Sequence, residues 1–314
     1  MTASNQRSLL FAFGAALIAG AFSTAAEDPA GRSRFYVTPA AAALVEQGLA
    51  LPAPAGPEAA AFQPVPAPGV RFRPNEAQAT TSPWVDSNAW RFQRGLRKGN
   101  YSKLEAGSAP LAAAEAFTFH ADAILNPDPA DLPELAKILT FLKTLDQPAL
   151  PVMANIGVID DGSPVMGEVL NMLNRRNLLY RVVPKPDPKL DLNVRLGDPD
   201  FPKQAANNPS DFAARVRAKL GDDKRLLRLY GTNTAIAYLT GDGKRARLCV
   251  LSYSRNRVQQ GVRIRLLGRY SAVKFAAYGA APGAGLMDFD HPSGATEFTI
   301  PPFSTIAVID LGPA

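Results

Sequence analysis

The sequence of 314 residues contains one cysteine and two histidines, and this scarcity limits its chemistry. A single thiol cannot form an intrachain disulfide, and the apolar surroundings of Cys249 (Arg-Leu-Cys-Val-Leu) are typical of a buried thiol rather than a nucleophile. So few sulfur and imidazole ligands argue against a structural zinc site. We therefore expect neither a metal nor a cofactor.

Long apolar runs are also scarce. The run from Leu9 to Phe22 is short for a membrane span, follows the lone charge of Arg7 and precedes the small residues Ser23 to Ala26. This order is typical of a secretory signal, so we predict that residues 1–26 are a signal peptide and that the protein is exported to the periplasm or the medium. An uncleaved membrane anchor is the alternative, and later stretches are too interrupted by charge or proline to cross a bilayer.

Residues 27–82 have few apolar side chains at either structural period and are rich in proline and alanine. This composition predicts an extended linker with one short helix near residues 39–49. The alternative is a segment packed across the following domain and anchored by Phe62, Val70 and Phe72.

Residues 83–208 alternate between helix and strand patterns. Helices are predicted at 108–120, 132–142 and 163–176, the last with Ser163 as N-cap and Pro164 at its first position. Strands are predicted at 122–126, 151–160 and 178–183, and 184–208 is expected to be irregular. The short joints predict a small α/β domain with a parallel βαβ unit.

Residues 209–314 begin with a helix to Leu220 and continue as short strands that alternate in polarity. The strands are predicted at 226–230, 235–239, 246–253, 261–267, 272–278, 296–300 and 305–311, with a hairpin at Gly241-Asp-Gly. In Val262-Arg-Ile-Arg-Leu the apolar residues face one way and both arginines the other. The fold class is therefore α/β followed by all-β, ending in an antiparallel β-sandwich.

A βα fragment with Trp84-Val-Asp-Ser-Asn, a βαβ unit around Ile156-Gly-Val-Ile-Asp-Asp-Gly-Ser and a closing sandwich resemble the C-terminal portion of secreted glycoside-hydrolase-like proteins. The resemblance implies a barrel-like fragment, an amidotransferase-like (GATase-like) unit and a carbohydrate context. The chain has no room for a complete eight-stranded barrel, which needs about 250 residues. Amidotransfer needs a cysteine where this unit has Asp-Gly-Ser, so that chemistry is excluded.

Three aspartates are the candidates for catalysis. Asp160 and Asp161 follow a predicted parallel strand, where open α/β sheets place ligands, and they could bind a cation or act as acid and base. Capping of the next helix is the alternative. A triad of Ser163, His120 and an aspartate lacks the G-x-S-x-G elbow that such a serine needs.

The third aspartate belongs to a group typical of sugar sites. Trp84 could stack on a pyranose while Asp86 and Asn88 bind its hydroxyls. The alternative is that Trp84 and Trp90 anchor the end of the linker in the core.

The most uneven charge lies between residues 244 and 269, which include no acidic residue. The basic residues are Lys244, Arg245, Arg247, Arg255, Arg257, Arg263, Arg265 and Arg269. We expect a basic sheet face that binds an acidic glycan or envelope polymer through Arg247, Arg263, Arg265 and Tyr253, or else a merely solvated face. Nucleic acid is excluded as a partner because the chain is predicted to be exported and has no recognition motif.

The sequence thus predicts an exported, noncatalytic glycoside-hydrolase-like module that binds carbohydrate or an anionic envelope polymer. Two alternatives remain open at this point. One is an active secreted glycoside hydrolase that uses Asp86, Asp160 or Asp161, and the other is a structural subunit of an exported complex.

Overall fold

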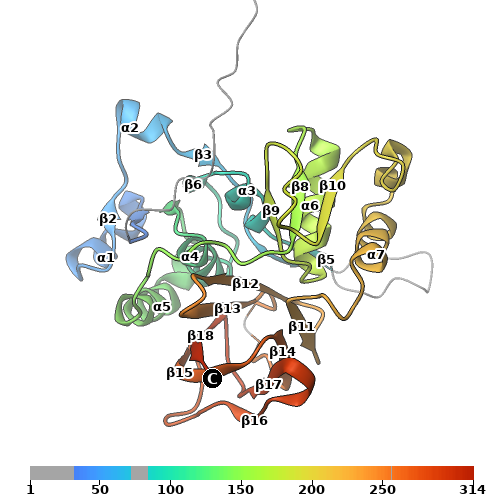
Figure 1. The fold of residues 1–314 in the computed structure, drawn as a ribbon. Helices are drawn as coiled ribbons and strands as arrows, with labels where there is room; N and C mark the ends of the chain where they lie inside the picture. Colours follow the sequence, from blue (N-terminus) through green and yellow to red (C-terminus); the bar gives the residue numbers. More distant parts are fainter. Residues whose placement is uncertain (1–31, 72–83, 256) are drawn as a thin grey trace, which may run out of the picture.

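The computed structural model describes residues 32–71, 84–255 and 257–314, arranged as two α/β units above a β-sandwich (Figure 1). The predicted signal peptide and Phe72 lie outside these ranges. Within them, an α/β part is followed by antiparallel sheets, so the predicted fold class is confirmed. No helix of the described residues is long and apolar enough to cross a membrane.

The first unit is built on five parallel strands that follow the cyclic order of a barrel. These are β1 (Phe35–Val37), β2 (Leu51–Pro52), β3 (Gln63–Pro64), β6 (Lys98–Tyr101) and β7 (Asp122–Leu125), in the sheet order β2-β1-β7-β6-β3. The last strand pairs with the first, as in a closed barrel, but β2 and β3 are not paired. We call this sheet the barrel-like sheet. It is a ring with one gap.

Proline protects both edges of that gap. The residues that follow each edge strand donate their N–H inward, from Ala53 to Val37 O (2.9 Å) and from Val65 to Asn100 O (3.0 Å). Because N–H groups alternate in direction along a strand, the preceding residues would direct theirs outward. Those residues are prolines, Pro52 and Pro64, which have no N–H, so neither edge readily pairs with a further strand.

The interpretation of residues 27–82 as a linker is wrong for the part that the structure describes. Residues 35–64 supply three of the five strands of the barrel-like sheet, with short helices α1 (Ala42–Glu46) and α2 (Gly56–Ala60) between them. Phe62 is buried against Tyr36, with ring centroids 5.4 Å apart, as the alternative expected. Strands of two or three residues are too short to show a period in sequence, which explains the error.

The second α/β unit is a parallel sheet of β10 (Leu192–Arg195), β8 (Ile156–Ile159) and β9 (Tyr180–Val182), in that order. Helix α6 (Pro164–Arg175) joins β8 to β9, and the predicted N-cap is confirmed because Ser163 Oγ accepts a hydrogen bond from Met166 N (3.1 Å). The strand β10 lies in the stretch that we expected to be irregular. Helix α7 (Pro209–Leu220) buries Phe212 and Val216 in this unit, so residues 209–220 do not belong to the sandwich.

The sandwich packs two antiparallel sheets face to face. One contains β12 (Ala235–Gly241), β13 (Ala246–Ser252), β18 (Ile306–Pro313) and β15 (Tyr270–Ala277), and the other β11 (Leu227–Tyr230), β14 (Val262–Leu267), β17 (Ala295–Ile300) and β16 (Met287–Asp290). Residues such as Leu248, Ile264 and Phe298 fill the space between them. Only the short β16 was missed in the sequence.

Helix α4 (Ala109–Thr118) connects the barrel-like sheet to the sandwich. Every residue of α4 is buried, and its core cluster extends to Ile236, Leu251 and Ile306 of the sandwich. Five of its ten residues are alanines, whose small side chains let both the barrel-like sheet and the sandwich approach the helix closely. The helix α5 (Leu132–Thr144) covers its outer side.

Candidate functional site

The carboxyl edge of the barrel-like sheet is where barrel enzymes carry their catalytic residues. The residues that follow its five strands are Thr38, Ala53, Val65, Ser102 and Asn126. Thr38 Oγ1 donates to Asn126 Oδ1 (2.9 Å), and Asn126 Nδ2 donates to Ser102 O (2.7 Å). In the described sheet, therefore, no strand is followed directly by an aspartate or a glutamate.

The residues of the predicted sugar-binding group near residue 84 do not form one site. Its strand β5 (Trp84–Asp86) pairs with β4 (Gly69–Arg71) outside the barrel-like sheet, contrary to the expected barrel fragment. The guanidinium of Arg175 stacks on the Trp84 ring at 4.0 Å. Asp86 forms an ion pair with Arg71, whose Nη2 lies 2.8 Å from Asp86 Oδ1.

Asp160 and Asp161 follow β8 as predicted, but hydrogen bonds within the chain hold both. Arg94, which follows the helix α3 (Ala89–Gln93), approaches Asp160 with Nε 2.7 Å from Oδ2 and Nη2 2.8 Å from Oδ1. Asp161 Oδ1 accepts from Ser163 N (2.9 Å), and the hydrogen bonds from Ser163 lower the pKa of this carboxyl. Both aspartates therefore organise the start of α6, which is the capping role that we gave as the alternative.

Trp84 and Asp160 do not belong to one site. Trp84 lies against Arg175 in the last turn of α6, whereas Asp160 precedes the first turn. A helix of 12 residues is about 18 Å long. Between these ends, α3 packs so tightly that a methyl group on Gly167 would lie 2.9 Å from the Trp90 ring.

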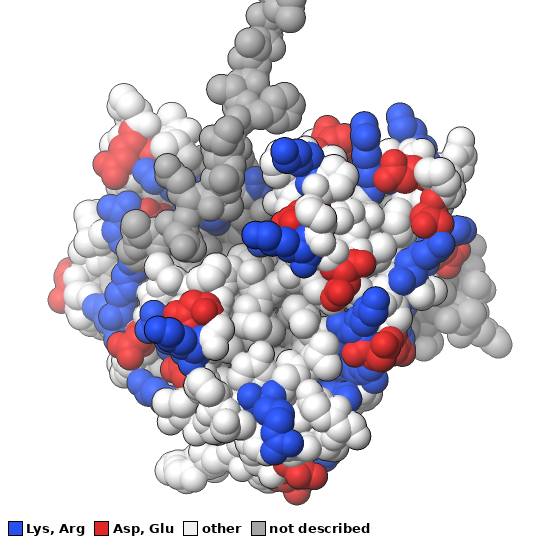
Figure 2. All heavy atoms as spheres, viewed as in Figure 1, with Lys and Arg blue, Asp and Glu red and all other residues white. Residues whose placement is uncertain are grey.

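Acidic side chains pair with most of the basic residues between 244 and 269. Five of these eight basic residues form ion pairs, namely Arg245 with Asp242, Arg247 with Asp310, Arg255 with Glu105, and both Arg263 and Arg265 with Glu297. Strand pairing explains why, because Asp310 lies opposite Arg247 and Glu297 lies opposite Arg265 in the neighbouring strands. The expectation of a one-sided basic face is therefore wrong. Figure 2 likewise shows basic and acidic side chains interspersed on the face in view.

Two of the predicted ligand-binding residues belong to a buried cluster around Glu115 that the sequence did not indicate. Glu115 is fully buried in α4, and its Oε1 accepts from Asn88 N and Tyr253 OH, both at 2.7 Å. Its Oε2 accepts from Asn88 Nδ2 (3.0 Å) and from Tyr101 OH (3.1 Å). Ser87 Oγ completes the set, 3.2 Å from Glu115 Oε1 and 2.8 Å from Tyr253 OH.

We call these residues, Ser87, Asn88, Tyr101, Glu115 and Tyr253, the Glu115 cluster. Burial raises the pKa of the Glu115 carboxyl, while the hydrogen bonds from the cluster oppose that rise. The donors come from the turn after β5, from β6 and from the loop after β13. The cluster therefore joins α/β and sandwich segments, and it holds Asn88 and Tyr253 in the core rather than at a surface.

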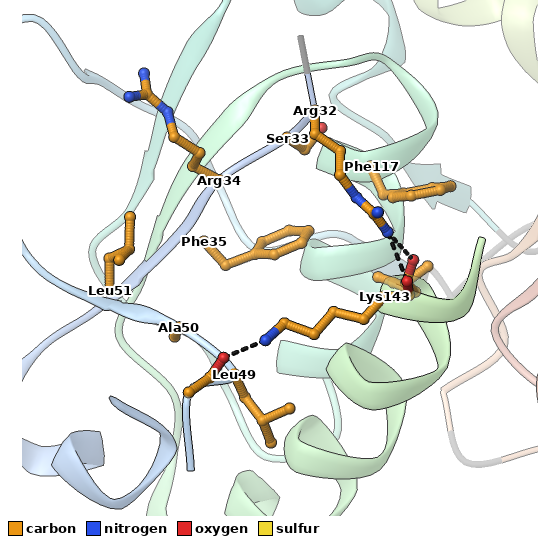
Figure 3. Close-up of a pocket in the computed structure, with 11 residues that line it drawn as sticks. Arg32, Ser33, Arg34, Phe35, Leu49, Ala50, Leu51, Phe117 and Lys143 are labelled. Carbon is orange, nitrogen blue, oxygen red and sulfur yellow. Dashed lines mark hydrogen bonds between the residues drawn. The ribbon is translucent and has the colours of Figure 1, made fainter. Parts of the chain in front are cut away.

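A cavity of about 270 Å³ opens at the amino end of the barrel-like sheet (Figure 3). It is lined by Arg32, Ser33, Arg34, Phe35, Gly48, Leu49, Ala50, Leu51, Phe117, Leu142 and Lys143. We call it the amino-end cavity. Figure 3 shows the Phe35 ring and the side chains of Arg32 and Lys143 directed into it, while Arg34 points away.

The cations of the amino-end cavity differ in their partners. Arg34 forms an ion pair with Asp122 at 2.6 Å. Arg32 instead caps the end of α5, with Nη2 donating to the carbonyls of Leu142 (3.1 Å), Lys143 (2.8 Å) and Leu145 (2.8 Å). Lys143 donates to Gly48 O.

Sequence patterns gave no signal for this cavity. Arg32 and Phe35 lie in the segment that we interpreted as a linker, and Lys143 looks like an ordinary basic residue in the last turn of a helix. In the described ranges, no three side chains of His, Cys, Asp or Glu are grouped in a way that could hold a metal ion.

Comparisons with known proteins identify the type of fold. No family model matches the chain, and no curated protein matches it. Among solved structures, alpha-L-fucosidase isoenzyme 2 from Paenibacillus thiaminolyticus is similar with a TM-score of 0.51 and 9% identity, over 66% of this chain and 57% of the fucosidase chain. The fold is glycoside-hydrolase-like.

Two further structures are similar at lower scores. They are a beta-galactosidase from Rahnella sp. R3 (TM-score 0.42, 9% identity, 79% of this chain and 60% of that chain) and the exo-carrageenase GH42 from Bacteroides ovatus (0.41, 8%, 79% and 47%). The chain thus spans about half to three-fifths of the length of these three structures.

Proposed function

We propose that this chain is an exported, noncatalytic glycoside-hydrolase-like module that binds carbohydrate. The observation that carries the proposal is the carboxyl edge of the barrel-like sheet. There Asn126 accepts a hydrogen bond from Thr38 Oγ1 and donates one to the main-chain carbonyl of Ser102, at the positions where barrel enzymes keep their reactive groups. Glycoside hydrolysis ordinarily needs two carboxyl groups that flank the scissile bond.

The carboxylates near this edge and the other candidate acids also have other roles. Asp128, two residues beyond Asn126, accepts from Ala130 N at 2.9 Å and so caps the short helix that follows. Asp86 and Asp160 are each engaged in an ion pair with an arginine, Arg71 and Arg94 respectively. A glycoside-hydrolase-like fold whose described carboxylates are engaged in this way is suited to recognising a sugar rather than cleaving it.

The catalytic half of the proposal is tested by incubating the protein at high concentration with a panel of polysaccharides and measuring reducing ends. We expect no release above the buffer blank. Release that disappears in an Asp160→Asn, Asp161→Asn double variant would overturn the noncatalytic assignment.

The binding half is tested by affinity electrophoresis of the same protein in gels that contain each polysaccharide. Retardation in at least one polysaccharide is expected, and free migration in all of them would refute carbohydrate binding.

Export is tested by expressing the full chain in a bacterium and sequencing the amino terminus of the secreted or periplasmic form. Cleavage after Ala25 or Ala26 is expected, and an intact Met1 in the membrane fraction would favour an anchor.

A further inference from the structure

We infer that the amino-end cavity binds an acidic sugar residue, that is, a pyranose that carries a carboxylate or a sulfate. This inference rests on the proposed function, because it names the class of carbohydrate and the place where the module holds it. The proposed binding site therefore lies in the first α/β unit and not, as the sequence predicted, in the basic stretch of the sandwich.

Charge is the first argument. The lining includes three cations and no acidic residue, and only Arg34 has a carboxylate partner in the part of the chain that the structure describes. Arg32 and Lys143 are bonded to main-chain carbonyls, which are dipoles and do not cancel a full positive charge. Two unneutralised cations at a partly apolar cavity attract an anion more strongly than they would in open water.

Donor capacity is the second argument. Among the described residues, every hydrogen bond of Arg32 uses Nη2, so the N–H groups of Nη1 and Nε remain for a ligand. Lys143 is exposed and reaches across the cavity to Gly48 O. Because an ammonium group binds a carboxylate better than a neutral carbonyl, an entering anion would take Lys143 from Gly48.

Shape is the third argument. The walls between the cations are apolar, with the Phe35 ring facing the space and Leu51 largely exposed beside it. A sugar ring has an apolar face that stacks on an aromatic side chain and a polar rim that meets charged groups, which matches this division. The volume of about 270 Å³ is near the lower limit of ordinary ligand pockets, so it suits a short segment of a glycan.

The amino-end cavity lies at the end of the barrel-like sheet opposite to the one at which barrel enzymes catalyse. Arg34 precedes β1 and its partner Asp122 begins β7, so the cavity lies at the amino end of the strands. Barrel enzymes catalyse at the opposite end, where Thr38 and Asn126 lie here. An acidic sugar held at the amino end would therefore remain intact.

Titration calorimetry of the full chain with a galacturonic acid trimer at low ionic strength tests the inference. The fully methyl-esterified trimer serves as the matched neutral ligand, a sulfated galactose oligomer as the second anion, and decanoate as an anionic acyl chain. We expect the acid trimer or the sulfated oligomer to bind at least tenfold more tightly than the ester, and added salt to weaken binding. Which of the two anions binds more tightly identifies the anionic group.

The matched variants are Lys143→Ala and Lys137→Ala, both in α5. Lys143→Ala should weaken binding of the acidic sugar about tenfold or more, because a charge-assisted hydrogen bond is lost. Lys137 is paired with Glu134 outside the cavity, so Lys137→Ala should leave binding unchanged. Unfolding midpoints of both variants show whether the fold is intact.

Three results would overturn the inference. One is that neither the acid trimer nor the sulfated oligomer binds more tightly than the ester, another is equal effects of the two lysine variants, and the third is tight binding of decanoate but of no sugar. Retardation by a neutral glycan with no acid-specific binding would refute the acidic-sugar site and leave the proposed function standing. Failure to bind any glycan would refute both.

Discussion

The substitution Tyr253→Phe removes one hydroxyl of the Glu115 cluster, together with its hydrogen bonds to Glu115 and Ser87, without changing the shape of the core. It removes the hydroxyl that donates to Glu115 Oε1 at 2.7 Å, and both residues are fully buried. Hydrogen bonds to charged groups contribute about 1.5–3 kcal/mol each. We therefore expect the free energy of unfolding, measured in urea, to fall by about 2 kcal/mol, with a melting temperature lower by roughly 4–8 °C.

The effect should also depend on pH. The hydrogen bond from Tyr253 lowers the pKa of Glu115, whereas burial raises it above the usual 4.5. A carboxyl whose folded pKa is raised makes the protein lose stability as pH rises from the usual value to the raised one. Removing the hydroxyl raises the folded pKa further, so the difference in stability between wild type and Tyr253→Phe should grow as the pH rises above the usual carboxyl pKa of 4.5.

Tyr230→Phe is the matched control, because Tyr230 is largely exposed at the end of β11. It should change the free energy of unfolding by less than about 0.5 kcal/mol. Two results would contradict this expectation: a cost of Tyr253→Phe no larger than that of the control, or a cost that does not grow as the pH rises above 4.5.

Three further predictions concern single groups. Ser163→Ala should lower the free energy of unfolding in urea by about 1 kcal/mol because α6 loses its N-cap, and Ser163→Gly should cost only a few tenths. Burial raises the pKa of Cys249 to about 12, so the native protein should resist iodoacetamide at pH 8 and react fully in urea, as mass spectrometry would show. Arg217 holds the pKa of Asp222 at about 2, and Arg217→Gln should let it rise toward 3.8 in an NMR titration. The stability that this pair contributes should be present above about pH 4 and lost as pH falls toward 2.

Elements with strong local signals were predictable from sequence. The helix after Ser163 carries its cap and proline in two consecutive residues, and the strand at 261–267 shows the alternation of a sandwich strand. The strands at 51–52 and 63–64 have no period at all, and they exist because neighbouring strands supply their hydrogen bonds. The barrel-like sheet was therefore the part of the fold that was hardest to predict from the sequence.

The site was harder to predict than the fold because its electrostatics are nonlocal. Arg247 reads as a free cation in its own strand, yet Asp310 neutralises it from 63 residues away. Nothing in the sequence marks Arg32 or Lys143, yet the fold brings these two residues, 111 positions apart, to one cavity whose lining has no carboxylate. The number of charged residues in one sequence segment therefore does not give the net charge of the surface that they form, because partners from distant segments contribute to it.

The central claim is that the module binds a carbohydrate and leaves it intact, and equilibrium dialysis measures both properties at once. The full-length protein is dialysed against a defined acidic oligosaccharide, and the ligand is quantified and weighed by mass spectrometry on both sides of the membrane. The account predicts saturable accumulation on the protein side, with the oligosaccharide recovered at its original mass. Equal concentrations on both sides, or recovery of shorter products, would contradict it.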